Sequence, residues 1–254
     1  MGSNSRPPTS QRTGVAEVTA ALDAGEAIGR ILVEHDAEGE VSRLVARARG
    51  LGIPVEPASS GDLRRLSLGP PAPILALVGR NAEASAEDVF GLPGAKWLLV
   101  GAAYPGNVGA ALRTMEVAGA AGAFVDAELD RAGRRAALRT SMNAERFMPI
   151  FWEGADPVVA QARAAGHTIV AVEDVGDRAP WEVDLRGPAL FVVGGEDRSL
   201  SPERLATCDA VVRLPMRGFV PCYNLQAAVA AVALERLRQE AAPHGSGSGA
   251  PPTG

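Results

Sequence analysis

Short apolar runs alternate with stretches of helical spacing along most of the chain. Runs such as Ile74–Val78, Lys96–Ala102, Thr168–Val172 and Leu190–Val193 are typical of strands that are buried on both faces. Between such runs lie segments with helical spacing, for example Asp156–Gly166. Strands that alternate with helices predict an α/β fold, with a mainly parallel sheet in the larger part of the chain.

The same pattern divides the chain into two α/β blocks between two polar tails. Residues 1–13 and 242–254 are rich in Ser, Pro, Thr and Gly, and we expect both tails to be disordered. Residues 14–80 are expected to form a small α/β sandwich, residues 81–95 a polar linker, and residues 96–241 the larger domain. The smaller block has few residues of catalytic type, which indicates a binding module.

The last predicted helix, from Asn224 to about Glu240, is apolar on nearly all sides. Leu225 and Val229 lie on one side of it, and Leu234 and Leu237 lie on another. A helix of this kind must be covered on several faces, and a second subunit would provide such a cover.

Composition limits the possible chemistry. Cys208, Cys222 and three histidines are scattered, which predicts reduced thiols and no metal site. No apolar run is long enough to span a membrane and no signal-peptide pattern is present, so we expect a cytoplasmic protein that does not contact membranes.

The formal net charge of −5 does not indicate a nucleic-acid-binding chain as a whole, but arginines gather in two places. Such clusters either contact RNA phosphates or form solvated helix faces. The first contains Arg43, Arg47, Arg49, Arg64 and Arg65, and the second contains Arg131, Arg134, Arg135, Arg139 and Arg146.

Three polar segments of the larger block each follow a predicted strand. They are Asn107 with Arg113, the break Gly194–Glu196, and Leu214–Met216 followed by Val220–Leu225. Because the carboxyl ends of parallel strands form one edge of a sheet, the three segments predict a polar ligand site there. None of them matches a nucleotide-binding fingerprint.

Each residue also has a simpler interpretation when it is taken singly. Asn107 and Asn224 would be helix caps, Arg113 a surface charge and Glu196 a loop acid. The order and spacing of the segments favour a common site.

Together the segments resemble the SpoU/TrmH family of RNA 2′-O-ribose methyltransferases, within the SPOUT class. Pro105–Thr114 looks like the first motif of that family, Val193–Ser201 like the second, and Leu214–Met216 with Asn224–Ala230 like the third. The first block looks like the L30e/L7Ae-like RNA-binding domain that precedes the catalytic domain in several members that act on ribosomal RNA.

The resemblance implies a fold and an activity that the apolar pattern does not indicate. It implies a deep trefoil knot that binds S-adenosylmethionine, a homodimer, and transfer of a methyl group to a ribose 2′-hydroxyl, with ribosomal RNA favoured as substrate. By the same resemblance, Arg113 activates the hydroxyl of a substrate bound beside the partner's cofactor. Asn107, Glu196 and Asn224 are the other catalytic candidates.

The resemblance also assigns binding residues. The cofactor-binding candidates are Gly194, Gly195, Glu196, Leu214, Met216, Cys222, Tyr223 and Asn224. The RNA-binding candidates are Arg43, Arg47, Arg64, Arg65, Arg134, Arg135 and Arg139.

Four positions depart from the usual residues of the family. Asp197 and Ser199 stand where the second motif usually has glycine, and Cys222 and Tyr223 stand where the third usually has serine and leucine. Two alternatives therefore stay open beside a ribosomal-RNA methyltransferase. One is an enzyme that acts on transfer RNA, and the other is an RNA- or ribosome-binding member that has lost activity.

Overall fold

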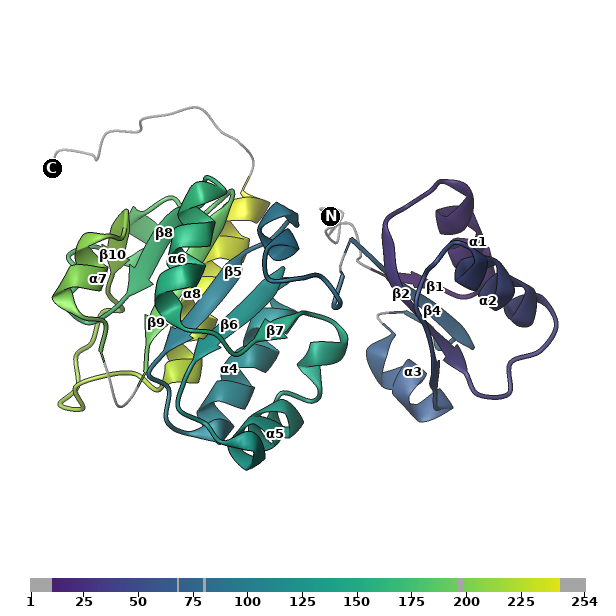
Figure 1. The fold of residues 1–254 in the computed structure, drawn as a ribbon, viewed down its shortest axis with the longest axis horizontal. Coiled ribbons are helices and arrows are strands. Elements are labelled where there is room, and N and C mark those ends of the chain that lie inside the picture. The colour runs from purple at the N-terminus through teal and green to yellow at the C-terminus, as the bar shows by residue number, and fades with distance from the viewer. Residues whose placement is uncertain (1–10, 68, 80, 196–198, 243–254) are drawn as a thin grey trace, which may run out of the picture. The chain divides into compact units, whose positions relative to one another are not determined.

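The computed structural model describes residues 11–67, 69–79, 81–195 and 199–242. Residues up to Ala84 form one compact unit and residues from Ser85 form another, and each unit contains its own sheet (Figure 1). The first unit is built from β1 (Gln11–Thr13), α1 (Val15–Asp23), β2 (Ile28–Glu34), α2 (Glu40–Gly50), β3 (Val55–Ala58), α3 (Ser60–Leu66) and β4 (Ile74–Val78).

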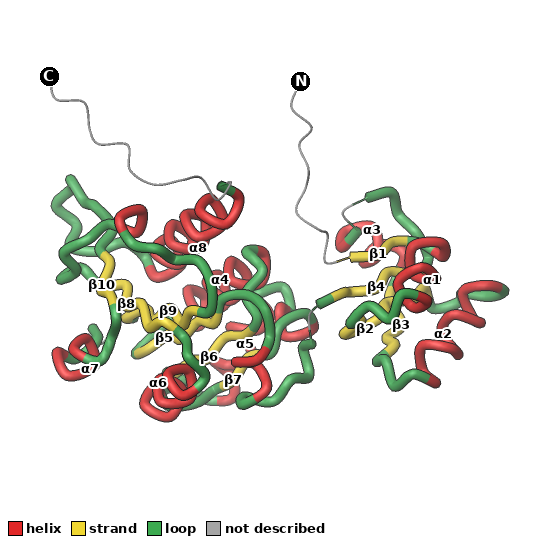
Figure 2. Tube along the Cα trace, turned by 90° about the horizontal axis from the view of Figure 1, so that it is seen from above, coloured by secondary structure: helices red, strands yellow, loops and turns green. Residues whose placement is uncertain are grey.

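The first unit is a four-stranded mixed sheet with helices on both faces. β4 lies between β1 and β2 and runs antiparallel to both, whereas β3 pairs in parallel with β2. Ile31 and Val33 of β2 pack with the buried side chains of α1 and α2 on one face. Leu63 of α3 is buried on the other face (Figures 1 and 2). This layered arrangement agrees with the predicted small α/β sandwich.

The prediction of a disordered tail over residues 1–13 is wrong for its last three residues. Gln11–Thr13 form β1, which pairs with β4 so that Gln11 lies opposite Leu77 and Thr13 opposite Leu75. The free edge of β4 offers backbone partners that a polar tripeptide can use without burying its side chains. Residues 1–10 and 243–254 lie outside the described residues.

The second unit contains a fully parallel sheet with the strand order β10-β8-β9-β5-β6-β7. This confirms the predicted mainly parallel sheet. Its elements are η1 (Asp88–Gly91), β5 (Lys96–Val100), α4 (Pro105–Val117), β6 (Gly122–Asp126), α5 (Arg131–Thr140), η2 (Ala144–Arg146), β7 (Ile150–Phe151), α6 (Ala155–Ala164), β8 (Thr168–Val172), η3 (Pro180–Glu182), β9 (Ala189–Gly194), α7 (Pro202–Ala206), β10 (Ala210–Val212) and α8 (Leu225–Ala241).

Helices cover both faces of this sheet, which explains the continuous apolar runs of its strands. Alternate residues of β5 face opposite sides, so Trp97 belongs to the core under α4 and α8, and Leu98 to the core under α6. In Figure 2, α4 and α8 lie above the row of strands, and α6 and α7 lie below it.

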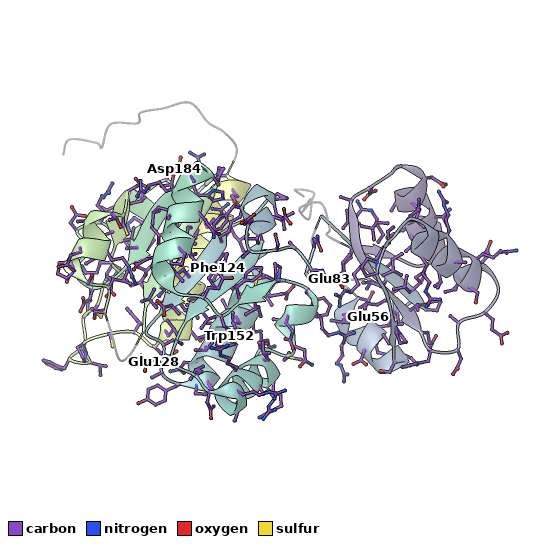
Figure 3. The ribbon with its side chains drawn as sticks, in the orientation of Figure 1. Glu56, Glu83, Phe124, Glu128, Trp152 and Asp184 are labelled. Carbon is purple, nitrogen blue, oxygen red and sulfur yellow. The ribbon has the colours of Figure 1, made fainter. Side chains whose placement is uncertain are left out.

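The predicted linker over residues 81–95 is wrong in its second half. Val89 and Phe90 of η1 are buried in the core of the second unit, and the Phe90 ring stacks on Phe124 at a centroid distance of 5.5 Å. Figure 3 labels Phe124 in the interior of that unit. Two large apolar side chains are more stable under the sheet than in water, so this part of the connection folds onto the larger domain.

Lys96, the only lysine of the chain, is buried at the start of β5. Its Nζ donates hydrogen bonds to the carbonyl oxygens of Leu92 (2.6 Å) and Gly94 (3.1 Å). Burial disfavours the charged form and the Arg236 guanidinium adds repulsion, so the pKa of Lys96 is lowered to about 8.

We therefore expect Lys96 to make the free energy of unfolding rise with pH between about 8 and 10.5. In this window the unfolded chain keeps a proton that the folded chain has lost, whereas below it both states are protonated. The slope should approach about 1.4 kcal/mol per pH unit. Denaturant titrations of the wild type and Lys96→Met over this range measure the difference. Identical slopes in the two proteins would contradict the lowered pKa.

Candidate functional site

A cavity of about 230 Å³ lies where β8 and β9 end, at the carboxyl edge of the parallel sheet. Open α/β sheets bind their ligands at this edge. The walls come from the ends of β8 and β9, from the β10–α8 segment (residues 213–224) and from the start of α8. The described lining residues are Val172, Glu173, Asp174, Val193, Gly194, Gly195, Ser199, Leu214, Met216, Pro221, Cys222, Tyr223, Leu225 and Ala228.

Two glycines at the end of β9 allow the close packing that shapes this cavity. A Cβ atom at Gly194 would overlap Oε1 of Glu173. A Cβ atom at Gly195 would overlap the carbonyl oxygen of Gly101 and lie 2.5 Å from the amide nitrogen of Ala102. The two glycines are therefore needed for different reasons. Gly194 leaves room for the Glu173 side chain, and Gly195 leaves room for the backbone that follows β5.

The β10–α8 segment provides another wall of the cavity. Four residues predicted to bind a cofactor, Leu214, Met216, Cys222 and Tyr223, all line the cavity from this segment. The Tyr223 hydroxyl donates a hydrogen bond to the carbonyl oxygen of Pro215 (2.9 Å), which ties the two ends of the segment together. The Tyr223 side chain is about half exposed, so its ring forms a wall and leaves the cavity open.

Glu173, which directly follows β8, lines the same cavity and was not among the predicted site residues. Its Oε1 accepts a hydrogen bond from the Leu200 amide (2.7 Å), and burial raises the pKa of its carboxyl group. An acid at the carboxyl end of the strand Thr168–Val172 was the available signal. Its importance depends on β8 lying beside β9, which the sequence did not specify.

The two predicted asparagines do not line the cavity. Asn224 caps α8, because its Oδ1 accepts a hydrogen bond from the Gln226 amide (2.9 Å). Asn107 was expected to be the N-cap of its helix, and this is wrong: the cap is Tyr104, and Asn107 lies in the first turn of α4. Pro105 explains the earlier start, since its fixed φ and missing amide hydrogen suit the first helical position.

Arg113 is exposed on α4 and does not line the cavity of its own chain. The next residue, Thr114, accepts a hydrogen bond from the Gln226 side chain (3.2 Å), which joins α4 to the start of α8. Arg113 therefore lies on a helix that is bonded to α8, and the first residue of α8, Leu225, lines the cavity.

One predicted residue falls in a gap of the structure. Glu196, assigned to both the catalytic and the cofactor-binding set, lies outside the described residues, as does Asp197. Ser199, just beyond the gap, lines the cavity.

The predicted RNA-binding arginines of the second unit are exposed on α5. The Arg134 guanidinium lies 5.0 Å from the centre of the Trp152 ring, whereas Arg135 and Arg139 are exposed and lie one helical turn apart. A Cβ atom at Gly109 would overlap the backbone of α5, so this helix packs closely on the first turns of α4. Because α4 begins where β5 ends, α5 lies at the carboxyl edge of the sheet (Figure 1).

The predicted RNA-binding arginines of the first unit lie on opposite faces of its sheet. Arg43 and Arg47 are on α2, whereas Arg64 and Arg65 are on α3 (Figure 1). Arg47 and Arg65 each form an ion pair with an aspartate of this unit. The sequence grouped the four residues, and the structure separates them into two pairs.

The described residues show neither a metal-binding cluster nor a membrane-spanning helix. They contain no group of three or more His, Cys, Asp or Glu side chains placed to hold a metal ion. No helix in the described part of the chain is long and apolar enough to cross a membrane.

Comparison with known sequences identifies related proteins. The model of the SpoU rRNA Methylase family matches residues 96–234. The 23S rRNA (guanosine-2′-O-)-methyltransferase RlmB of Pseudomonas aeruginosa is 27% identical over 142 residues, which cover 56% of this chain and 57% of that protein. The 23S rRNA (uridine(2479)-2′-O)-methyltransferase of Streptomyces viridochromogenes is 28% identical over 242 residues, which cover 89% and 81%. This chain thus spans little more than half the length of the Pseudomonas relative.

Solved structures with the same fold cover most of the chain. The crystal structure of an RNA 2′-O ribose methyltransferase is 26% identical, with a TM-score of 0.54 over 91% of this chain and 88% of that one. The SpoU methyltransferase AviRb of Streptomyces viridochromogenes, solved in complex with AdoMet, is 23% identical, with a TM-score of 0.54 over 91% and 89%. The second likeness concerns the fold alone.

Proposed function

Because the chain belongs to the SpoU rRNA methylase family, we propose that it transfers a methyl group from S-adenosylmethionine to a ribose 2′-hydroxyl of ribosomal RNA. The proposal includes the deep trefoil knot, the homodimer and the cytoplasmic location expected from the sequence. It includes an L30e/L7Ae-like role for the first unit.

The observation that carries this proposal is the cavity itself. Gly194 comes from the end of β9, and Leu214 and Tyr223 come from opposite ends of the β10–α8 segment. All three were assigned to the cofactor by resemblance, and they line one cavity. All three lie within the residues matched by the family model. A ligand site at the carboxyl edge of the sheet, formed by the residues of the second and third motifs, is what a methyl-donor pocket requires.

The lining suits a cofactor with a flat heterocycle and polar edges. Val172, Leu214 and Leu225 offer apolar side chains, and Gly194 and Gly195, which have no side chain, let a ligand approach the backbone closely. S-adenosylmethionine would supply an electrophilic methyl group, so the protein mainly has to align the hydroxyl with it.

Arg113 is proposed to stabilise the negative charge that develops on the ribose oxygen. A guanidinium stays protonated at any physiological pH, so it acts as a fixed positive charge and hydrogen-bond donor rather than as a base. Its place on the outside of α4, away from the cavity of its own chain, supports a role beside the cofactor of a partner subunit.

Exposed apolar side chains on α8 support the homodimer. Leu234 is 65% exposed and Leu237 39% exposed on a helix whose other side packs under the sheet. A single exposed leucine is common on protein surfaces, but two leucines three residues apart form an apolar patch on one side of the helix. We assign this side of α8 to the subunit interface.

The arginines of α5, with those of the first unit, are proposed to hold the RNA. Replacing Arg135 and Arg139 together by alanine should weaken RNA binding. The slope of the logarithm of the binding constant against the logarithm of the salt concentration should fall by the amount expected for about two lost phosphate contacts. Filter-binding titrations at several salt concentrations measure both effects.

The matched control is the double variant Arg186→Ala/Arg238→Ala. Both arginines are exposed, and they lie at the amino edge of the sheet with Asp184, which Figure 3 labels far from Trp152. Equal losses in the two double variants would mean that general charge, rather than the surface of α5, governs binding.

The direct test of the function is transfer of a labelled methyl group to undermethylated ribosomal RNA, followed by digestion and identification of 2′-O-methylated nucleosides. Incorporation of the labelled methyl group into transfer RNA alone would show that transfer RNA, and not ribosomal RNA, is the substrate. If the protein binds ribosomes but neither binds the cofactor nor transfers a methyl group, it is an RNA- or ribosome-binding member of the family and not an enzyme.

A further inference from the structure

The charged side chains among the described lining residues of the cavity all have one sign. Among the described lining residues, Glu173 and Asp174 are carboxylates, and there is no lysine, arginine or histidine. Most of the remaining lining is apolar side chain or glycine backbone, which screens charge less well than water does. A bound group that carries positive charge is therefore favoured over a neutral group of the same shape.

Glu173 is the better placed of the two acids. Its carboxylate lies directly over Gly194 at the end of β9, in a space that exists only because this residue has no side chain. The hydrogen bond from the Leu200 amide to Oε1 fixes its orientation. Asp174, the next residue, is exposed at the rim and adds a second negative charge.

Methyl transfer changes the charge of the molecule in the cavity. As the oxygen–methyl bond forms, the sulfur–methyl bond breaks with its electron pair left on sulfur, and the hydroxyl proton passes to water. The positively charged sulfonium becomes a neutral thioether, so the product carries one positive charge less than the methyl donor.

We propose that Glu173, assisted by Asp174, makes this cavity prefer the cationic methyl donor to the neutral demethylated product. This inference rests on the proposed function and assigns a specificity-determining role to a residue that faces the cofactor. The preference would promote product release, because the attraction that holds the donor is lost in the reaction itself.

The test compares the affinities of the two ligands in the wild type and in Glu173→Gln. Glutamine keeps an Oε1 atom that can accept the Leu200 amide, so the variant removes charge with little change in shape. Calorimetric titrations with S-adenosylmethionine and with S-adenosylhomocysteine should show the donor-to-product affinity ratio falling by about fivefold to tenfold. The affinity for an analogue with a protonated amine in place of the sulfonium should fall in Glu173→Gln by the same factor as the affinity for the methyl donor.

Two further variants sharpen the result. Asp174→Asn, at the exposed rim, should lower the same ratio by a smaller factor, and it keeps the test available if position 173 does not tolerate glutamine. Asp177→Asn is the matched control, since it removes a charge from the same connection but does not line the cavity.

An unchanged ratio in Glu173→Gln and Asp174→Asn, or an equal loss of affinity for both ligands, would overturn the selectivity while leaving the proposed function intact. Binding of neither ligand by the wild type would overturn the proposed function, and this inference with it. A fall in the ratio in Asp177→Asn as large as in Glu173→Gln would also count against it.

Discussion

Replacement of Arg113 by alanine is expected to reduce methyl transfer by at least about a hundredfold, the usual loss when a donor to a developing oxyanion is removed. Cofactor affinity should stay within about twofold, because Arg113 is proposed to act on the ribose hydroxyl and not to hold the cofactor. Arg113 is exposed, so its removal leaves the core unchanged. Single-turnover rates with labelled cofactor and calorimetric titration of the cofactor separate the two quantities.

Two comparisons test the assigned role. Arg113→Lys keeps a positive charge but loses the planar set of donors, so its rate should lie between those of the wild type and the alanine variant. Arg186→Ala, which removes an exposed arginine at the amino edge, should keep the wild-type rate. Equal loss of cofactor binding and transfer in Arg113→Ala would show that the residue belongs to the cofactor site instead.

Mixed dimers test whether Arg113 acts across the subunit interface. Arg113→Ala subunits have an intact cavity, and Gly194→Ala subunits have an intact arginine. An equal mixture of the two proteins is assayed at a cofactor concentration too low for Gly194→Ala subunits to bind. If the arginine serves the partner's cofactor, the mixture should then recover about a quarter of the wild-type activity, since half of the dimers carry one complete site. No recovery from a mixture that forms mixed dimers would place the arginine and the cofactor in the same subunit.

Gly195→Ala is expected to destabilise the second unit by about 3 kcal/mol, at the upper end of the usual cost of overpacking. The added methyl group would meet the backbone of Gly101 and Ala102, which cannot move without disturbing the end of β5. The Gly195 amide also donates a hydrogen bond to the Val100 carbonyl oxygen (2.7 Å), and this bond would be strained.

Gly194→Ala provides the contrast at the adjacent position. Its methyl group would meet only the end of the flexible Glu173 side chain. That side chain can move, but it then loses the hydrogen bond from the Leu200 amide, so the loss of stability should be about 1 kcal/mol. The displaced carboxylate should disturb the cavity and weaken cofactor binding. Urea denaturation and cofactor titration of both variants measure the two effects. Equal destabilisation by the two substitutions would contradict the different roles assigned to the glycines.

Local pattern was sufficient to predict most of the second unit. The run Thr168–Val172 forms β8 over the predicted residues, because its four buried residues, Ile169–Val172, are all apolar, as a strand covered on both faces requires. Polar or short segments were harder to assign. β1 and η1 are stabilised by what they pack against, the free edge of β4 and the core beside Phe124, and neither partner is visible in the local sequence.

The site was predictable where a motif marked it and not where the sheet order created it. Gly194, Leu214 and Tyr223 were identified from motif order and do line one cavity. Glu173 belongs to no motif, and it reaches the cavity only because β8 pairs with β9. The prediction that the arginines of the first unit form a single cluster was wrong for a related reason. Arg43 and Arg47 on α2 and Arg64 and Arg65 on α3 lie on opposite faces of the sheet (Figure 1).

The most direct test of the central claim is a crystal structure of the protein with S-adenosylmethionine. We predict electron density for the cofactor at the end of β9, over Gly194 and between Leu214 and Tyr223, with the sulfonium on the side of Glu173. Cofactor density at any other place, with this cavity filled only by water, would contradict the account.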